Sequence, residues 1–308
     1  MPDTNDIKKA AVRTDKFLER NVLYHKRRLT SAIEELERSI INMVSEFKTS
    51  DGTLMGPKVN FKLAQKTHAQ LSSLFKETYG VESREVVKGF NQSLKYIKKD
   101  FKSLDVVMDY TSVDKDMVKT LKTNALNNFA QFGDTARDQV ADVMYTSVLG
   151  KTSYAVMVGQ ISGILTGHLD KRGRSMSQYA DLYAHDAIMD FHNSVHLKKA
   201  EDLGFKYFLY YGNAMINTRD FCRRRIGKVF SKEEIESWDF PWNGKSGPAM
   251  TNRGGYNCRH HWRPVRKNWV DEDKLKADLE EEAVKSKKGD VPLMTSADKL
   301  TPCVMARG

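Results

Sequence analysis

Residues 29–47 read LTSAIEELERSIINMVSEF and decide the fold class of the first half of the chain. Apolar side chains recur here at steps of four, three, four, three and four residues, from Leu29 to Phe47. Steps that alternate between three and four place side chains along one face of a helix. A mean period of 3.5 residues is typical of a helical bundle or a coiled coil. The stretch therefore predicts a helix that buries one apolar stripe.

The same period returns further along the chain, from Val87 to Leu104. Between the two stripes, the turn residues of SDG (50–52) and GP (56–57) favour a connection, after which a helix is predicted from Phe61 to Tyr79. Glycine lowers helix stability, so Gly80 is expected to end that helix.

Two more helices are predicted before residue 150. Ser112 is a suitable N-cap for a helix through Phe132, and the Gly133-Asp134 pair is expected to separate it from a last helix that ends near Gly150. Residues 1–150 are thus expected to form a helical bundle or coiled-coil-like interaction region. Two alternatives remain open: the bundle buries its stripes internally, or it packs them on other subunits.

The sequence changes character after residue 150. A helix is predicted over 176–203, followed by an aromatic strand over 205–211, a short strand over 227–230 and a strand over 258–265. Ser231 and Glu234 are spaced as a capping box. We expect residues 151–270 to form a small α+β domain with a short antiparallel sheet, and residues 271–308 to form a charged helix and an extended tail. The fold class is α+β, mostly helical.

Composition narrows the classes of protein to consider. The 308 residues are 40% hydrophobic and 29% charged, which suits one or two packed domains. Three cysteines are too few to stabilise a secreted disulfide scaffold. No window resembles a signal peptide or a transmembrane span, so we expect folding in the cytosol and no standard membrane span.

The net charge of +10 is concentrated in one region. Between residues 201 and 270 there are 13 basic and seven acidic residues, so this quarter of the chain holds six of the ten excess charges. Tyrosines and tryptophans lie among them, a combination that suits phosphates and unstacked bases. The predicted nucleic-acid-binding residues are Arg219, Arg223, Arg224, Arg225, Lys228, Arg253, Arg259, Arg263, Arg266 and Lys267.

Two thiols and one imidazole in this region form a candidate metal site. Cys222, Cys258 and His260 are ligand types that zinc accepts, and the two predicted strands could bring them together. The neighbouring His261 should point to the opposite face of its strand. A fourth ligand would come from Asp220, His192, His196 or water. Alternatively, the three residues are hydrogen-bonded packing residues, or the cysteines form a disulfide in a finished particle.

Catalytic alternatives have less support in the sequence. A cysteine beside His260 would resemble a thiol and imidazole dyad, but no residue type nearby is placed to orient the imidazole. His185, His192 and His196 share one side of a predicted helix, yet Asn193 stands where a metalloprotease pattern needs glutamate. These histidines are expected to pack against the sheet. There is no phosphate-binding loop, and we expect no enzyme activity.

Two motifs, NTRDFCRRRIGKVFSKEEI (217–235) and GGYNCRHHWRPV (254–265), resemble the phage head morphogenesis family, whose members include Mu F-like minor head proteins. The family pattern places D-x-R-T-R-x-x-H/C before G-K-V-F and N-C-R-C. The matching positions are Thr218-Arg219, Cys222, Gly227 to Phe230 and Asn257 to Arg259. The resemblance covers about residues 150–267. Asn217 and His260 depart from it, standing where the family often has an acid and a second cysteine.

The resemblance implies a structural minor head protein of a tailed bacteriophage. Such a protein acts in head assembly, docks on the portal or the major capsid protein, and forms an oligomer on the portal. It lies in the virion, in the head interior or at the portal vertex, contacts phage DNA without sequence specificity, and either stays there or is delivered with the DNA. The alternative is an enzyme or toxin-like effector that uses cysteine and histidine chemistry on the same module.

Overall fold

The computed structural model describes residues 2–104, 106, 112–167, 175–238 and 248–279. Helices dominate, and two small sheets accompany them. The helices of the first two thirds are α1 (Thr4–Val44), α2 (Pro57–Lys102), α3 (Ser112–Gly150), α4 (Tyr154–Leu165) and α5 (Met176–Asp202). The remaining elements are β1 (Thr49–Ser50), β2 (Thr53–Leu54), β3 (Tyr207–Tyr211), α6 (Asp220–Arg223), β4 (Val229–Ser231), α7 (Lys232–Glu236), α8 (Ala249–Asn252), β5 (His261–Val265) and the 3-10 helix η1 (Lys267–Trp269).

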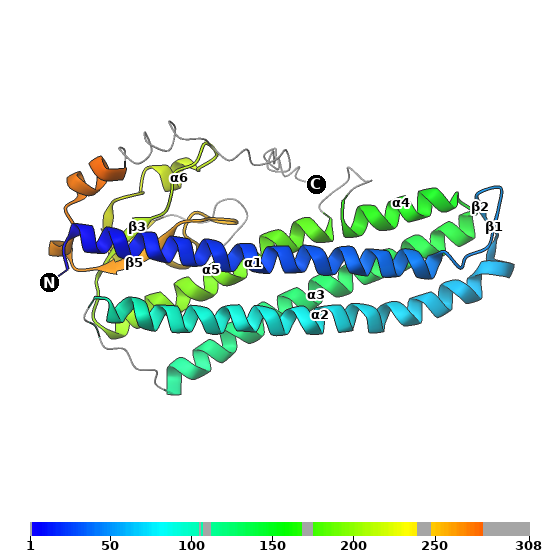
Figure 1. Cartoon of the computed structure of the whole chain (residues 1–308), viewed down its shortest axis with the longest axis horizontal. Helices are drawn as coiled ribbons and strands as arrows, with labels where there is room; N and C mark the ends of the chain where they lie inside the picture. The colour runs from blue at the N-terminus through cyan, green and yellow to red at the C-terminus, as the bar shows by residue number, and fades with distance from the viewer. Residues whose placement is uncertain (1, 105, 107–111, 168–174, 239–247, 280–308) are drawn as a thin grey trace.

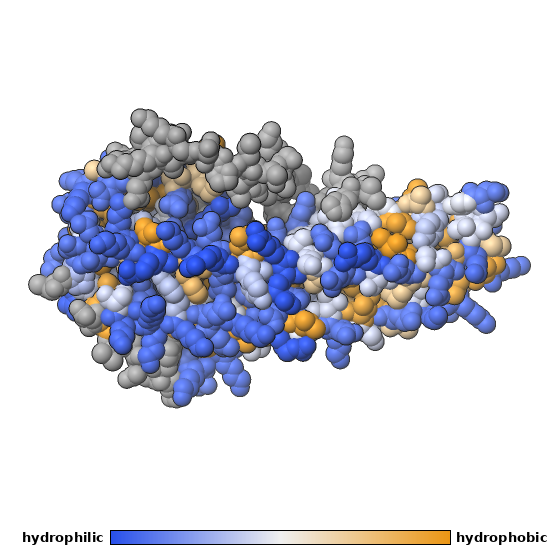
Figure 2. All heavy atoms as spheres, viewed as in Figure 1, coloured by the Kyte–Doolittle hydropathy of each residue, from blue (hydrophilic) through white to orange (hydrophobic). Residues whose placement is uncertain are grey.

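The long helices run side by side along the longest axis of the molecule (Figure 1). The small hairpin of β1 and β2 lies at one end of this helical stalk, and the sheet of β3, β4 and β5 lies at the other, beside the N-terminus. The predicted class, α+β and mostly helical, is confirmed. Figure 2 shows hydrophilic residues predominating over the sheet end of the visible face.

Most of the predicted apolar stripes are buried, although Val87 and Leu94 of α2 are half-buried and Val86 lies in the core. In α1 the buried set includes Leu29, Ile33, Leu36 and Ile40, after which Val44 replaces the predicted Met43 in the core. A period of 3.5 drifts from the 3.6 residues per turn of a straight helix, so the buried face moves by one position after a few turns.

Both predicted helix breaks are wrong. Gly80 and Gly133 lie inside α2 and α3, which continue through them. At Gly133 a Cβ atom would lie 2.1 Å from the ring of Tyr79, so this glycine admits an aromatic side chain of α2 where the helices cross. Burial of that ring outweighs the cost of about 1 kcal/mol for glycine in a helix.

The second sheet has the strand order β4-β3-β5, and both pairs are antiparallel. Leu209 pairs with Arg263 and Tyr211 with His261, so these side chains share one face. That face meets the helices, because Arg263 contacts Asp100 of α2. The opposite face carries Tyr210 and Trp262 and is covered by α6, α7 and their loops.

Several predicted boundaries shift by a few residues. The predicted strand over 205–211 begins at Tyr207, that over 227–230 is β4, and that over 258–265 begins at His261. Ser231 accepts a hydrogen bond from the amide of Glu234 at 3.1 Å, as its capping role requires. The predicted charged helix is present over 272–279, and its remainder and the tail lie outside the described residues.

The buried side chains form two clusters, and neither respects the predicted domain boundary at residue 150. One cluster joins the first half of α1, the second half of α2 and the end of α5 to the sheet. The other joins the rest of the stalk to α4 and the start of α5. The helices after residue 150 therefore complete the core of those before it. None of the described helices is apolar over enough of its length to cross a membrane.

Candidate metal centre and basic surface

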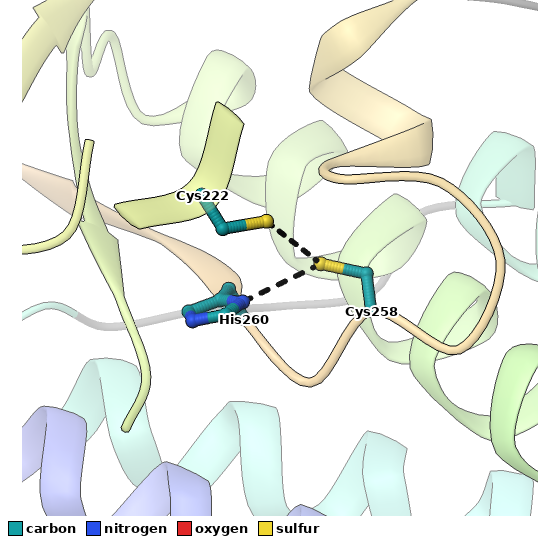
Figure 3. Close-up of side chains that lie close together, drawn as sticks. All are labelled: Cys222, Cys258 and His260. Carbon is teal, nitrogen blue, oxygen red and sulfur yellow. Dashed lines mark hydrogen bonds between the residues drawn. The ribbon is translucent and has the colours of Figure 1, made fainter. Parts of the chain in front are cut away.

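The predicted ligands Cys222, Cys258 and His260 come together at the outer face of the sheet (Figure 3). Cys222 lies on α6, and the other two lie in the segment that leads into β5. The Sγ atoms of the cysteines are 3.9 Å apart, and Cys258 Sγ lies 3.6 Å from His260 Nδ1. The three ligand atoms all lie within 4.8 Å of one another, and the side chains are buried.

The two shorter separations fit a tetrahedral zinc site. Zinc binds sulfur at about 2.3 Å and imidazole nitrogen at about 2.0–2.1 Å, which places two sulfurs about 3.8 Å apart and a sulfur and a nitrogen about 3.6 Å apart. The observed distances of 3.9 and 3.6 Å agree with both values. The sulfurs are too far apart for a disulfide, whose bond length is about 2.05 Å.

A glycine makes room for the sulfurs. A Cβ atom on Gly254 would lie 2.3 Å from Cys222 Sγ, closer than real Cβ atoms come, and 3.0 Å from Cys258 Sγ, which is a tight contact. The same residue donates its backbone N–H to Cys258 Sγ at 3.2 Å. A backbone donor at this distance stabilises a negatively charged sulfur. Gly254 therefore provides both the space and a hydrogen bond for a thiolate.

The pKa values of the two thiols are shifted in opposite directions. Burial alone would raise the pKa of Cys258, but hydrogen bonds from Cys222 and His260 and the positive charge of Arg253 hold it well below the ordinary value. The hydrogen bond to Cys258 and then burial raise the pKa of Cys222. Cys258 is thus the first thiolate of the pair, and Cys222 is the proton donor. A cation that binds both sulfurs would displace that proton.

Tyr210 of β3 supports the cluster from the sheet. Its hydroxyl donates to Cys222 Sγ at 3.3 Å and lies 3.6 Å from Cys258 Sγ. Its ring stacks on that of His260, with centroids 5.3 Å apart. Burial raises the pKa of Tyr210 well above its ordinary value, so the hydroxyl stays protonated and remains a donor.

None of the protein side chains named as a fourth ligand joins the cluster. Asp220 is exposed, and the group of potential ligand atoms includes neither His192 nor His196. Of the four alternatives, the structure leaves water. His261 points to the opposite face from His260, as predicted, and its Nδ1 lies 3.3 Å from a carboxylate oxygen of Asp15 on α1.

A second buried polar cluster lies where the sheet meets the stalk. Asp100 of α2 accepts hydrogen bonds from the guanidinium of Arg263 at 3.1 and 3.2 Å, and its carboxylate lies 3.4 Å from His196 Nε2. Burial opposes the charge of Asp100, but Arg263 and then His196 outweigh it and lower the pKa of the carboxyl. His185, His192 and His196 are all buried; the last two lie at this junction, as predicted.

Two of the residues that were predicted to bind DNA are buried. Arg263 is fully buried on Asp100, and Arg253 is fully buried and donates to Asp190 at 2.8 Å. A guanidinium that neutralises an interior carboxylate is not available to a phosphate, so we remove both residues from the predicted set. Exposed members of that set are Arg223, Arg224, Lys228, Arg259, Arg266 and Lys267, while Arg219 and Arg225 are half-buried.

The aromatic part of that prediction also fails. Tyr210, Tyr211, Trp262 and Trp269 belong to the core, and Trp242 lies outside the described residues. Tyr256 is exposed. Arg225 packs over the rings of Phe221 and Trp238, at 3.8 and 4.1 Å from their centroids. Alternation of basic and aromatic residues in the sequence thus reflects a packed sheet with a basic exterior.

Three residues of the site were not predicted from the sequence: Gly254, Tyr210 and Asp100. Gly254 stands four residues before Cys258, which was a usable signal because glycine often marks close approach. Nothing in the sequence connects Tyr210 or Asp100 to the cysteines or to Arg263. No protein-family model, no curated protein and no solved structure matches the chain.

Proposed function

We propose that the chain is a structural minor head protein of a tailed bacteriophage, acting in head assembly and contacting packaged DNA. The observation that carries the proposal is the direct contact between the two sequence motifs of the chain. Arg219 of the first motif donates to the carbonyl oxygens of Gly254 and Tyr256 in the second, and Cys222 meets Cys258. Residues about 35 positions apart thus form one compact module, as the family resemblance requires.

The basic exterior supports the DNA contact. Exposed arginines and lysines displace counterions condensed on DNA, which is favourable at low salt and independent of base sequence. Arg224 and Lys228 are exposed on this module, whereas Lys58 and Lys62 are exposed near the hairpin at the other end of the stalk. The stalk itself is the part that would dock on the portal or the capsid.

A DNA-binding measurement tests this assignment of surfaces. In filter-binding titrations with duplex DNA, affinity falls with salt, and the double variant Arg224→Gln and Lys228→Gln reduces the slope of log affinity against log salt by about 2. The matched variant Lys58→Gln and Lys62→Gln removes the same charge and leaves the slope unchanged. If the variant of Arg224 and Lys228 kept the wild-type slope, the module would not be the part that contacts DNA.

The same module is proposed to hold one structural zinc ion on Cys222, Cys258 and His260, with water as the fourth ligand. The ion would join α6 to the segment before β5, and so stabilise the packing of both motifs. Emission spectroscopy on the purified chain should give one zinc per molecule, and Cys222→Ser should abolish it. Cys303→Ser, which removes the third cysteine of the chain, is the matched cysteine control. Zinc-free wild-type protein of unchanged stability would refute the metal.

The head role itself is tested on particles. Purified virions should contain the chain at a fixed copy number, attached at the portal vertex and removed together with portal oligomers after mild disruption. The alternative, an enzyme or toxin-like effector, needs substrate access to a thiol. Cys222 and Cys258 are 1% and 2% exposed, which favours the structural role. Virions without the chain, or turnover of a substrate by the isolated protein, would overturn the proposal.

A further inference from the structure

One exposed turn of the module presents a large apolar side chain to solvent. Residues Met215 to Thr218 form a β-turn, closed by a hydrogen bond from the amide of Thr218 to the carbonyl of Met215 at 3.0 Å. Ile216 occupies the second position of the turn and is fully exposed, and Met215 is 38% exposed. Glycine, proline, asparagine, aspartate and serine dominate such turns, because their backbones or side chains favour them. A β-branched isoleucine adds nothing to the stability of this one.

The turn is held rigidly by its neighbours. The hydroxyl of Thr218 accepts from the amide of Met215 at 2.7 Å. Nη2 of Arg223 donates to the carbonyls of Ile216 and Thr218 at 3.4 and 3.1 Å. Nη1 of Arg259, from the second motif, lies 3.1 Å from Met215 Sδ. A side chain displayed on a fixed backbone loses little conformational entropy when it binds, so this arrangement favours recognition.

Several arginines lie beside the apolar tip. Arg223 and Arg259 contact the turn, Arg219 directly follows it in the chain, and Arg224 is the C-cap residue of α6. Between residues 213 and 225 the single acidic residue is Asp220. A guanidinium has five N–H donors, so Arg223 can hold the turn through Nη2 and still bind a phosphate oxygen.

Duplex DNA is the partner that matches an apolar tip flanked by arginines. Isoleucine and methionine are among the side chains that architectural proteins insert between base steps, while flanking cations neutralise the phosphates on either side. A single-stranded partner would need exposed aromatic platforms for its bases. Tyr210, Tyr211 and Trp262 of this region are buried, and Tyr256 is the one exposed side chain among the described tyrosines and tryptophans of residues 205–269. A single platform would stack on a single base, so the described residues favour a duplex.

We infer that the turn Met215–Thr218 is a DNA wedge: Ile216 enters between stacked base pairs and kinks the duplex, while Arg223 and Arg259 hold the adjacent phosphates. The inference rests on the DNA contact of the proposed function and adds its mode. Insertion unstacks a base step and bends the duplex by about 20–90°. The protein would therefore change the shape of DNA as well as bind it.

The test measures the shape of DNA bound by the full chain. A duplex of about 25 base pairs, labelled at both ends, reports bending as an increase in energy transfer at saturating protein. Relaxation of a closed plasmid by topoisomerase in the presence of protein reports unwinding. The variant is Ile216→Ala, and the matched control is Leu149→Ala, which truncates another exposed apolar side chain at the opposite end of the stalk.

Wild-type protein and Leu149→Ala should raise energy transfer and shift plasmid linking number, and Ile216→Ala should lose both effects. Because no charge changes, Ile216→Ala should retain the salt slope of wild-type binding. Bending that is absent in wild type, or unchanged in Ile216→Ala, overturns the inference. Binding of anionic phosphatidylserine vesicles that depends on Ile216, without bending of DNA, would overturn it in favour of a lipid surface.

The outcome is independent of the head role. If the chain is missing from virions but kinks DNA through Ile216, the proposed function fails and the wedge stands. If the chain is present in virions and binds DNA with the expected salt slope but does not bend it, the wedge alone fails.

Discussion

At the scale of single residues, Gly254 is the position where we expect the candidate metal site to tolerate least change. Its φ is not in the left-handed region, so an alanine would be opposed by contact alone: the new Cβ would lie 2.3 Å from Cys222 Sγ. We expect Gly254→Ala to abolish stoichiometric zinc and to lower the free energy of unfolding by about 1–3 kcal/mol, the usual cost of overpacking.

Emission spectroscopy and urea titration measure the two effects. Gly150→Ala is the control, because its Cβ would meet no atom closer than 3.7 Å. Retention of zinc by Gly254→Ala would mean that the sulfurs separate without cost, contrary to the packed site described above.

Asp100 is the residue on which the buried charges at the junction depend. Replacing it with asparagine leaves the guanidinium of Arg263 buried without a counter-charge, because Arg263 is fully enclosed. Removal of one partner of a buried pair costs about 3–5 kcal/mol. Urea unfolding of Asp100→Asn should show this loss.

The matched control is Asp134→Asn, which breaks an exposed pair with Arg137 and should cost about 0–1 kcal/mol. If the two variants lost equal stability, the Asp100 pair would be no more important than a surface ion pair.

The sequence predicted which three potential ligands come together, but it placed two buried arginines on the surface. Cys222, Cys258 and His260 are residue types with few other uses in a buried sheet, so their proximity to two strands was informative. Arginine serves equally on a surface and in a buried pair, and the count of charges does not separate these cases. Arg253 and Arg263 could be recognised as interior only after Asp190 and Asp100, distant in the sequence, were placed beside them.

At the scale of elements, the crossings of α1, α2 and α5 enclose histidines that are uncharged at neutral pH. Burial lowers the pKa of His25 to about 4 and holds the pKa of His192 well below 6.5. These side chains stay neutral in the folded protein but take up protons after unfolding once the pH is below about 6.5. Their contribution to the free energy of unfolding is therefore complete above pH 6.5 and is lost as the pH falls toward 4.

We expect the free energy of unfolding to decrease by at most about 1.4 kcal/mol per pH unit for each such histidine between pH 6.5 and 4. Urea titrations at several pH values measure this, and His25→Gln should reduce the slope because it removes one titrating group. The carboxyl of Asp100 has a lowered pKa, so its loss of charge adds to the effect only at lower pH. A pH-independent free energy over this interval would contradict the buried neutral state.

Helix positions were predictable where burial repeats along one face, and the ends were predictable less often. The stripe of α1 was found because its period is visible within 19 residues. The break at Gly133 was wrong because glycine in a sequence signals either a helix end or a close contact, and here Tyr79 of α2 makes the close contact. At Gly80 a Cβ atom would meet only an Arg84 nitrogen at 4.0 Å, so no close contact explains why α2 continues there. No sequence pattern predicted a role for the exposed turn at Ile216, because that role depends on the arginines that the fold places beside it.

At the scale of the whole molecule, the stalk and the sheet module share a hydrophobic core. Phe90 and Phe101 of α2 belong to the same buried cluster as Phe208 and Trp262 of the sheet. Two elements that bury their apolar faces against each other lose that burial together, so the molecule should unfold as one unit at this end. Division at residue 150 would leave both fragments with exposed core surfaces.

Two optical signals report on the two parts separately. All four tryptophans lie between residues 238 and 269, so fluorescence follows the module, whereas far-ultraviolet circular dichroism is dominated by the long helices of the stalk. Phe101→Ala, a stalk substitution at the shared core, should lower the free energy of unfolding by about 3–5 kcal/mol and move both transitions together. Phe75 also lies on α2 but belongs to the other buried cluster, so Phe75→Ala is the matched control for the size of the side chain. It should affect circular dichroism at least as much as fluorescence. If Phe101→Ala moved the dichroism transition alone, the module would be an independent domain, and the helices would be a separable docking arm.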